Sequence, residues 1–275
     1  MRFLEVSGQR SGPPFVSFGF APAQITLLQV VALLAPVLAS LITRGMAAVQ
    51  VGILVLIVSL VWEALFAFVR RRPLTWHGLT TALILVVMAP DTVPLWELAL
   101  AVSFGVTLGE LVFGGRGFGF LNGAVAALAF LIFSFPGTGL AGNSALIAIC
   151  SLPGALLLMV AGLISWRVLV SAIGVLTVFS LAKSGEFDPA TTLAAVAFAL
   201  VFLVCDPLSA ASTNPGRWVY GGLVGGLAVY FDPLAGPAFA PSALVFAALL
   251  GGIFAPLIDH GVVMALVAWR RRRFG

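Results

Sequence analysis

The chain has 275 residues, of which 61% are hydrophobic and only 9% are charged. Soluble domains carry about 25% charged residues, so this composition excludes a soluble domain and indicates an integral membrane protein. The formal net charge of +4 does not indicate nucleic-acid binding, because the basic residues stand at the edges of apolar segments, where they orient membrane proteins.

Residues 1–22 carry Arg2 and Arg10 but have no apolar core before position 15. This pattern is unlike a secretory signal, and we predict a short cytoplasmic segment instead. No later stretch is polar enough to form a soluble domain. We therefore predict a single membrane domain over residues 23–269 and a basic cytoplasmic tail over residues 270–275.

Ten apolar segments follow one another along the chain, and each is predicted to form a transmembrane helix. Their approximate limits are 23–43, 47–69, 78–89, 94–113, 119–135, 144–165, 167–183, 190–205, 217–231 and 243–269. With the N-terminus in the cytoplasm, all of the 14 Lys and Arg residues except Arg44 and Lys183 lie on the cytoplasmic side. This asymmetry predicts a multi-pass protein of a bacterial inner membrane with both termini in the cytoplasm.

The third and eighth segments are short, and each ends beside an Asp and a Pro. Residues 79–89 are followed by Pro90 and Asp91, and residues 191–205 are followed by Asp206 and Pro207. A straight helix needs about 20 residues to cross about 30 Å of hydrocarbon. Both segments are therefore predicted to form short or broken helices.

Each short segment is the third of five in its half of the chain. Because five is an odd number, a second copy of the repeat enters the membrane upside down. We predict an all-α fold of about ten transmembrane helices in two inverted five-helix repeats, about 23–136 and 143–269. Paired short helices at matching places in two such repeats usually mark a buried site.

Three carboxylates near membrane depth have a structural explanation in the sequence. Glu63 lies within about two turns of the arginines at 70–72, which favours a structural partner or a place at the cytoplasmic edge. Glu97 follows a proline at the start of a segment, where a negative charge complements the helix dipole. Asp259 lies deep in the last segment and either pairs with His260 or has a functional role.

Glu110 and Asp206 are the two carboxylates that stand beside turning or re-entering segments. An intramembrane carboxylate is a functional candidate because its burial is costly. Arg217 either pairs with Asp206 or faces an anionic group. We assign Glu110, Asp206 and Arg217 to an ion pathway or to a structural ion pair.

The histidines and cysteines are scattered, and no metal site is predicted. Cys150 and Cys205 lie in separate apolar runs without a CxxC partner. His77 and His260 are isolated and are interpreted as polar ends of spans. The glycine run at 114–119 lacks the GK[ST] ending of a phosphate loop and is interpreted as a tight turn.

Several motifs together carry a resemblance that covers about residues 24–273. They are LTTALILVVMAPDTVPLW (79–96), GELVFGGRGFGFLNGAVAALAFLIFSFP (109–136), NSALIAICSLPGALLLMVAGLISWR (143–167), DPLSAASTNPGRWVYGGLVGGL (206–227) and APLID (255–259). The chain resembles the NqrB/RnfD family. These are the membrane B subunit of the sodium-translocating NADH:quinone reductase (Nqr) and the D subunit of the Rnf complex.

The resemblance implies ten helices in two inverted repeats and partnership with other membrane subunits. It also implies electron transfer through flavins coupled to movement of Na⁺ or H⁺. In the family, the Thr of an S/T-G-A-T motif carries covalent FMN. Residues 137–143 read Gly-Thr-Gly-Leu-Ala-Gly-Asn, so Thr138 is not carried over as an attachment site and covalent FMN is not expected.

Two further departures lie near the glycine turn. Where the family has Gly-Lys-Glu before VFGG, this chain has Gly-Glu-Leu, with Glu110 in the middle. Where the family has Asn-Pro-Ala, this chain has Asn-Gly-Ala, which begins at Asn122. Gly114, Gly115 and Asn122 are the positions expected to contact a non-covalent flavin, either FMN or riboflavin.

The resemblance thus implies a membrane subunit of an Nqr/Rnf-like complex without covalent FMN. It would act as a scaffold or as an electron conduit through a non-covalent flavin, rather than as a stand-alone enzyme. The alternative is a small-solute or ion channel built on the same inverted-repeat fold.

Overall fold

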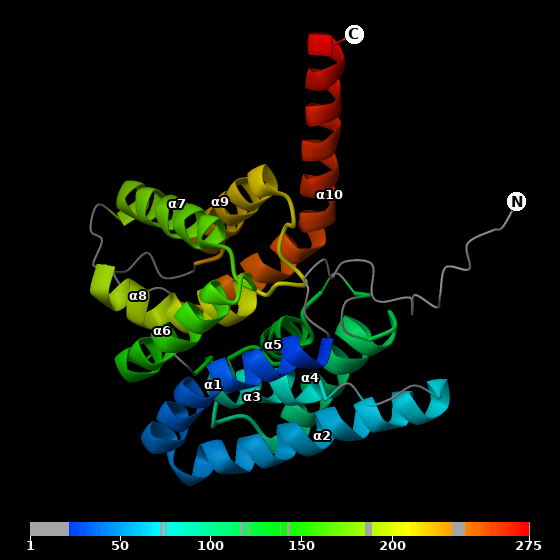
Figure 1. Ribbon diagram of the computed structural model, residues 1–275. Coiled ribbons are helices and arrows are strands. Elements are labelled where there is room, and N and C mark those ends of the chain that lie inside the picture. Colours follow the sequence, from blue (N-terminus) through cyan, green and yellow to red (C-terminus); the bar gives the residue numbers. More distant parts are fainter. Residues whose placement is uncertain are drawn as a thin grey trace, which may run out of the picture.

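The computed structural model describes residues 22–71, 74, 76–115, 118–119, 121–137, 139–141, 144–184, 189–232 and 240–274. Within them all regular structure is helical, with ten α-helices and two π-helical segments (Figure 1). The elements are α1 (Pro22–Arg44), α2 (Met46–Arg70), α3 (Gly78–Met88), α4 (Leu95–Val106), η1 (Thr107–Leu111), α5 (Gly123–Ser134), α6 (Ala145–Val160), α7 (Trp166–Ser184), α8 (Pro189–Ala199), η2 (Leu200–Val204), α9 (Asn214–Phe231) and α10 (Pro241–Phe274). The predicted all-α class is confirmed.

Each predicted apolar segment corresponds to one helix, or to one helix with its π-helical end. The largest differences are at α6, which ends at residue 160 instead of 165, and at α10, which continues to residue 274. By length and composition three helices are able to cross a membrane: Gln24–Arg44, Met46–Arg70 and Pro241–Arg272. The predicted N-terminal segment lies outside the described residues apart from Pro22.

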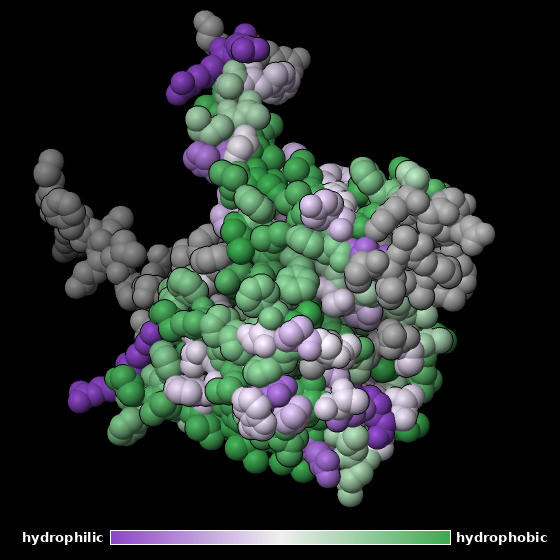
Figure 2. Space-filling model, turned by 180° about the vertical axis from the view of Figure 1, so that it is seen from behind, coloured by the Kyte–Doolittle hydropathy of each residue, from purple (hydrophilic) through white to green (hydrophobic). Residues whose placement is uncertain are grey.

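The surface of the molecule is largely apolar, as a lipid environment requires (Figure 2). On α1 the exposed apolar side chains recur every three or four residues, at Leu27, Val31, Leu34 and Leu38. This spacing places them on one face of the helix. The opposite face packs against the rest of the protein and is also largely apolar, so α1 is apolar on both faces, unlike a surface helix of a soluble protein.

The two halves of the chain share several helix contacts. In the first half α1 contacts α3, α2 contacts α4, and α4 contacts α5; in the second half the matching contacts are α6 with α8, α7 with α9, and α9 with α10. The halves meet where α1 packs on α6 and α5 packs on α10. In Figure 1, α1 to α5 gather in the lower part and α7 to α10 in the upper part, with α6 lying against α1.

Small residues allow close helix contact within the second half. A Cβ atom at Gly225 of α9 would lie 2.6 Å from the backbone oxygen of Ala172 in α7, and one at Gly221 would lie 2.6 Å from that of Val168. Backbone atoms cannot move aside as a flexible side chain can. Glycine is therefore required at both positions, in agreement with the small-residue packing expected of membrane helices.

Candidate functional site

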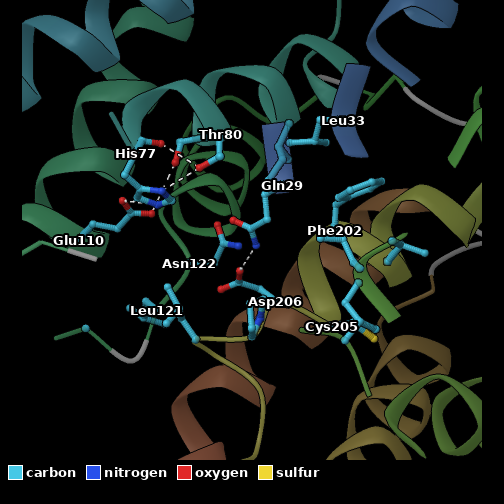
Figure 3. Close-up of a pocket in the computed structure, with 18 of the residues that line it drawn as sticks. Gln29, Leu33, His77, Thr80, Glu110, Leu121, Asn122, Phe202, Cys205 and Asp206 are labelled. Carbon is cyan, nitrogen blue, oxygen red and sulfur yellow. Dashed lines mark hydrogen bonds and ion pairs between the residues drawn. The ribbon is translucent and has the colours of Figure 1, made fainter. Parts of the chain in front are cut away.

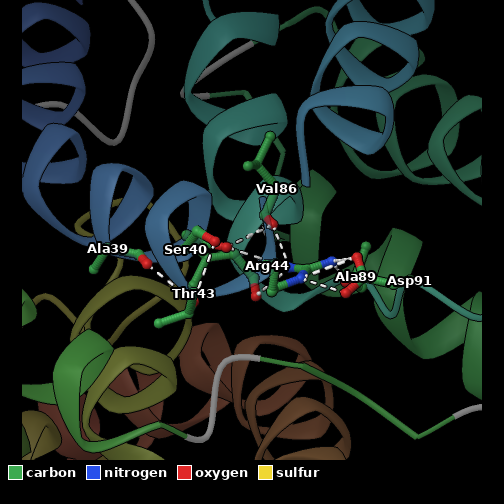
Figure 4. A network of polar contacts seen from close by, with 8 residues as sticks. Ala39, Ser40, Thr43, Arg44, Val86, Ala89 and Asp91 are labelled. Atoms are coloured by element: carbon green, nitrogen blue, oxygen red, sulfur yellow. Dashed lines mark hydrogen bonds and ion pairs between the residues drawn. The ribbon is translucent and has the colours of Figure 1, made fainter. Parts of the chain in front are cut away.

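The C-terminal end of α3 is held by one arginine from the end of α1 (Figure 4). Arg44 donates from Nη1 to the carbonyl oxygen of Val86 at 2.8 Å and from Nη2 to that of Ala89 at 2.7 Å. It also forms an ion pair with Asp91, with its Nε 2.8 Å from Oδ2. The last carbonyl groups of a helix lack intrahelical partners and carry partial negative charge. A guanidinium group here supplies both the hydrogen-bond donors and the compensating positive charge.

The N-terminal end of α3 is capped by a carboxylate from α2. Glu63 is buried and accepts the backbone N–H groups of His77 at 3.2 Å and Gly78 at 2.9 Å. Its negative charge complements the positive end of the helix dipole. The structural role expected of Glu63 thus has a specific partner, the start of α3. With charge of the appropriate sign at both ends, an 11-residue helix is stable inside the protein.

A small cavity lies between the two halves, where the start of α3 faces the end of η2 (Figure 3). Its volume is about 30 Å³, which is enough to hold a water molecule. Its polar and charged lining residues are Gln29, His77, Thr80, Thr81, Glu110, Asn122 and Asp206. Most of these residues belong to the first half, while Asp206 belongs to the second.

His77 and Glu110 form a buried pair on one side of the cavity. Nε2 of His77 lies 3.0 Å from Oε2 of Glu110, and its Nδ1 lies 2.8 Å from the hydroxyl oxygen of Thr80. The other carboxylate oxygen of Glu110 accepts the backbone N–H of Gly123, at the start of α5, at 2.9 Å. Glu110 therefore joins α3 to the start of α5 through its two oxygens.

Asp206 lies on the opposite side of the cavity, just after η2. Its Oδ1 accepts a hydrogen bond from Nε2 of Gln29 in α1 at 3.3 Å, and its Oδ2 accepts one from the hydroxyl of Ser209 at 3.3 Å. The contact with Gln29 crosses from the second half to the first. Asp206 is thus a buried carboxylate with a hydrogen bond to Gln29 across the two halves.

Both π-helical segments face this cavity. η1 supplies Glu110, and η2 supplies Val201 and Phe202. A π-helical turn is rare and occurs often at functional sites, because the extra residue changes the direction of nearby side chains. The two segments lie at the ends of α4 and α8, one in each half of the chain.

The structure brings together four of the six residues selected from the sequence. Gly115, Asn122, Glu110 and Asp206 all line the cavity. Asn122 also caps α5, since its Oδ1 accepts the backbone N–H of Ala124 at 2.9 Å.

The other two selected residues lie elsewhere. Gly114 is part of the turn after η1, with φ of 121°. Arg217 donates from Nε to the backbone oxygen of Ala211 at 3.3 Å. The side chain of Arg217 therefore contacts Ala211 and not Asp206, the partner considered from the sequence.

Sequence reasoning missed Gln29 and the contact of His77 with Glu110. Gln29 is one of two amide side chains, with Gln24, in the largely apolar segment 23–43, and that polarity was a usable signal. The histidine contact had no local signal, because 33 positions of the chain separate 77 from 110. His77 is therefore not isolated, contrary to our interpretation of the sequence.

The carboxylates at 97 and 259 have structural roles. Glu97 lies in the first turn of α4, as predicted. Asp259 accepts the backbone N–H groups of Ser212 at 2.7 Å and Thr213 at 3.0 Å, together with both hydroxyl groups. Its partner is the start of α9 rather than His260, the partner considered from the sequence.

The cavity does not fit a flavin as it stands. Small-molecule sites have volumes of about 300–1,000 Å³, ten times or more the volume found here. The described residues also contain no group of three or more His, Cys, Asp or Glu side chains arranged to hold a metal ion. What fits is a water molecule or a small monovalent ion.

Comparison with known proteins gives the family. The sequence profile described as the NQR2, RnfD, RnfE family matches residues 9–142 and 137–267. The chain belongs to this family. It is 30% identical over 270 residues to the B subunit of the Na(+)-translocating NADH-quinone reductase of Ectopseudomonas mendocina, a match that covers 77% of this chain and 66% of that protein.

Other members of the NQR2, RnfD, RnfE family give similar values. The corresponding reductase protein from Stutzerimonas stutzeri is 31% identical over 268 residues, and the one from Klebsiella pneumoniae is 30% identical over 281 residues. These matches cover 77% and 80% of this chain, and 66% and 68% of the relatives. The chain therefore spans about two thirds of the length of these relatives.

Proposed function

We propose that this chain is a membrane subunit of an Nqr- or Rnf-like ion-coupled electron transport complex in a bacterial inner membrane. Other membrane subunits assemble with it, and the cavity between its halves lies on the path of the translocated Na⁺ or H⁺. Family membership and the names of the relatives support the complex. The location and polarity of the cavity support the ion path.

The fold behind this proposal consists of two inverted repeats with ten spans. The matching helix contacts in the two halves support it. In this scheme α3 corresponds to α8 with η2, and Asp91 corresponds to Asp206. Each aspartate follows the C-terminal end of a short helix.

The position of Asp206 in the lining of the cavity carries the functional proposal. Asp91 is neutralised by Arg44, which also caps α3. At the matching place Asp206 faces the cavity and accepts a hydrogen bond from the neutral Gln29. A carboxylate inside a membrane protein that faces a cavity is a functional candidate, because its burial is costly.

The decisive experiment exchanges each aspartate for asparagine in the assembled complex, reconstituted in vesicles. Asp206→Asn should reduce NADH-driven uptake of ²²Na⁺, or acidification of the lumen if H⁺ is the ion, at least about tenfold. Its thermal unfolding midpoint should stay close to that of the wild type, because the asparagine can still bond Gln29. Asp91→Asn should lower the unfolding midpoint instead. Ion transport that survives Asp206→Asn would refute the role of this carboxylate.

A non-covalent flavin is tested separately. Because the cavity is too small for the ring system, we expect less than one acid-extractable flavin per purified chain and an intact mass equal to that of the polypeptide. One extractable flavin per chain would instead establish the electron-conduit role and place the flavin outside this cavity. A mass increase matching FMN would show covalent attachment at a residue other than one in an S/T-G-A-T motif.

A further inference from the structure

The second part of α10 leaves the body of the protein. α10 runs from Pro241 to Phe274 and contains Pro256. Proline removes a backbone hydrogen bond and bends a helix. Figure 1 shows the first part of α10 within the bundle and the part coloured red standing clear of it, across the direction of α1 and α2.

The start of the projecting part is fixed to the protein. Asp259 bonds Ser212 and Thr213 at the start of α9. Beyond this anchor, every residue from 263 to 270 is exposed. The exposed fractions are 57% at Met264 and 54% at Trp269. The projecting part is therefore a helix that is anchored at its start and exposed along most of its length.

This surface is apolar on every side. Residues 263–267 are Val, Met, Ala, Leu and Val, and five consecutive residues exceed one full turn of 3.6. A partner subunit would cover only one side of such a helix, and its other sides would still face lipid. Lipid chains surround a helix completely, which is the situation expected of a helix that is apolar all round.

The far end of the projection is strongly basic. Trp269 is followed by four arginines, 270–273, and hydrophilic side chains gather at the tip in Figure 2. Tryptophan favours the boundary between lipid chains and headgroups. Clusters of four or more basic residues next to a membrane helix favour anionic lipids, whose phosphate groups accept bidentate hydrogen bonds from guanidinium groups.

The length of the projection restricts it to one leaflet. Eleven residues separate Asp259 from Arg270, a helical distance of about 16 Å, compared with about 30 Å of hydrocarbon. Its direction across α1 and α2, which are long enough to span the membrane, also excludes a second crossing. We propose that residues 260–272 lie among the lipids of one leaflet and that the arginine run binds the phosphates of anionic phospholipids.

The first test measures lipid selectivity. The full chain is reconstituted in phosphatidylcholine vesicles, and electron spin resonance compares its association with spin-labelled phosphatidylglycerol and spin-labelled phosphatidylcholine. We expect an anionic preference of about fivefold or more at low salt. Changing Arg270, Arg271, Arg272 and Arg273 together to Gln should abolish the preference, while changing all four to Lys should retain most of it.

A matched control lies at the end of α2. Arg71→Gln removes one exposed arginine from another helix end and should leave the preference unchanged. The unfolding midpoint of the four-glutamine variant should equal that of the wild type, since Arg270, Arg271 and Arg272 are exposed. If the four-glutamine variant keeps the preference for phosphatidylglycerol, the proposal is wrong.

The second test locates the helix. The fluorescence of wild type minus that of Trp269→Phe isolates Trp269 from the other five tryptophans. We expect quenching of this difference signal by lipids brominated near the headgroup end of their chains, and little quenching by aqueous iodide. Failure of the brominated lipids to quench would show that a protein partner or water surrounds this part of α10, and would overturn the proposal.

Discussion

At the scale of single residues, Arg44 gathers several polar partners on one side chain. It bonds carbonyl groups at the end of α3 and pairs with Asp91. Arg44→Met should lower the free energy of unfolding by about 2–4 kcal/mol, because it leaves buried carbonyl groups without partners and a partly buried carboxylate without a counter-ion.

Chemical unfolding in mixed detergent micelles measures this change. Arg71→Gln is again the control, because its side chain is exposed and its expected effect lies within about 0.5 kcal/mol. Equal stability of the Arg44 and Arg71 variants would contradict the capping role of Arg44.

Glu63 has a corresponding role at the other end of α3. Glu63→Gln retains one acceptor oxygen but loses the charge and one of its two backbone hydrogen bonds. We expect a loss of about 1–2 kcal/mol in the free energy of unfolding. Glu97→Gln, in the first turn of α4, should cost less than 1 kcal/mol because that carboxylate is less buried. A larger loss for Glu97→Gln than for Glu63→Gln would disprove this account.

At the scale of helices, glycines on α9 set the distance to α7. Gly225→Ala would place a methyl group 2.6 Å from the backbone oxygen of Ala172, so the two helices must separate. The expected loss of stability is about 1–3 kcal/mol. Gly174→Ala in α7 is the control, because no atom lies within 4 Å of the added methyl group. It should be neutral or stabilising by up to about 1 kcal/mol, and thermal unfolding distinguishes the two.

The helices were largely predictable from the sequence, and the contacts between them were not. Hydropathy and the positions of Pro, Gly and Asp located α3 to within one or two residues of its bounds. The π-helical form of η1 and η2 had no local signal. The partners of Glu63, Glu110 and Asp259 lie 13 or more positions away in the chain, and hydropathy contains no information about such pairs.

The cavity was predictable only in outline. Asp206 and Glu110 stood out because a carboxylate within an apolar region is costly. Their grouping with Gln29 and His77 depends on how α1, α3 and η2 pack against one another. That packing follows from the shapes of many side chains together.

At the scale of the whole molecule, the charge asymmetry makes a prediction about orientation. Arg71 lies in the loop before α3 and Thr92 in the loop after it, and both residues are exposed. In a variant with Cys150 and Cys205 changed to Ala, Thr92→Cys should react with a membrane-impermeant maleimide in intact cells. Arg71→Cys should react only after the cells are opened. Labelling of both cysteines from the same side would refute the proposed topology.

The two caps of α3 also constrain how the protein enters the membrane. α3 has only 11 residues, too few to cross the bilayer alone, and its free backbone ends are costly in lipid. The side chains that satisfy those ends, Arg44 and Glu63, are made by the ribosome before α3 itself. We therefore expect α1 and α2 to be inserted first, and α3 to enter the bilayer by binding to them during synthesis.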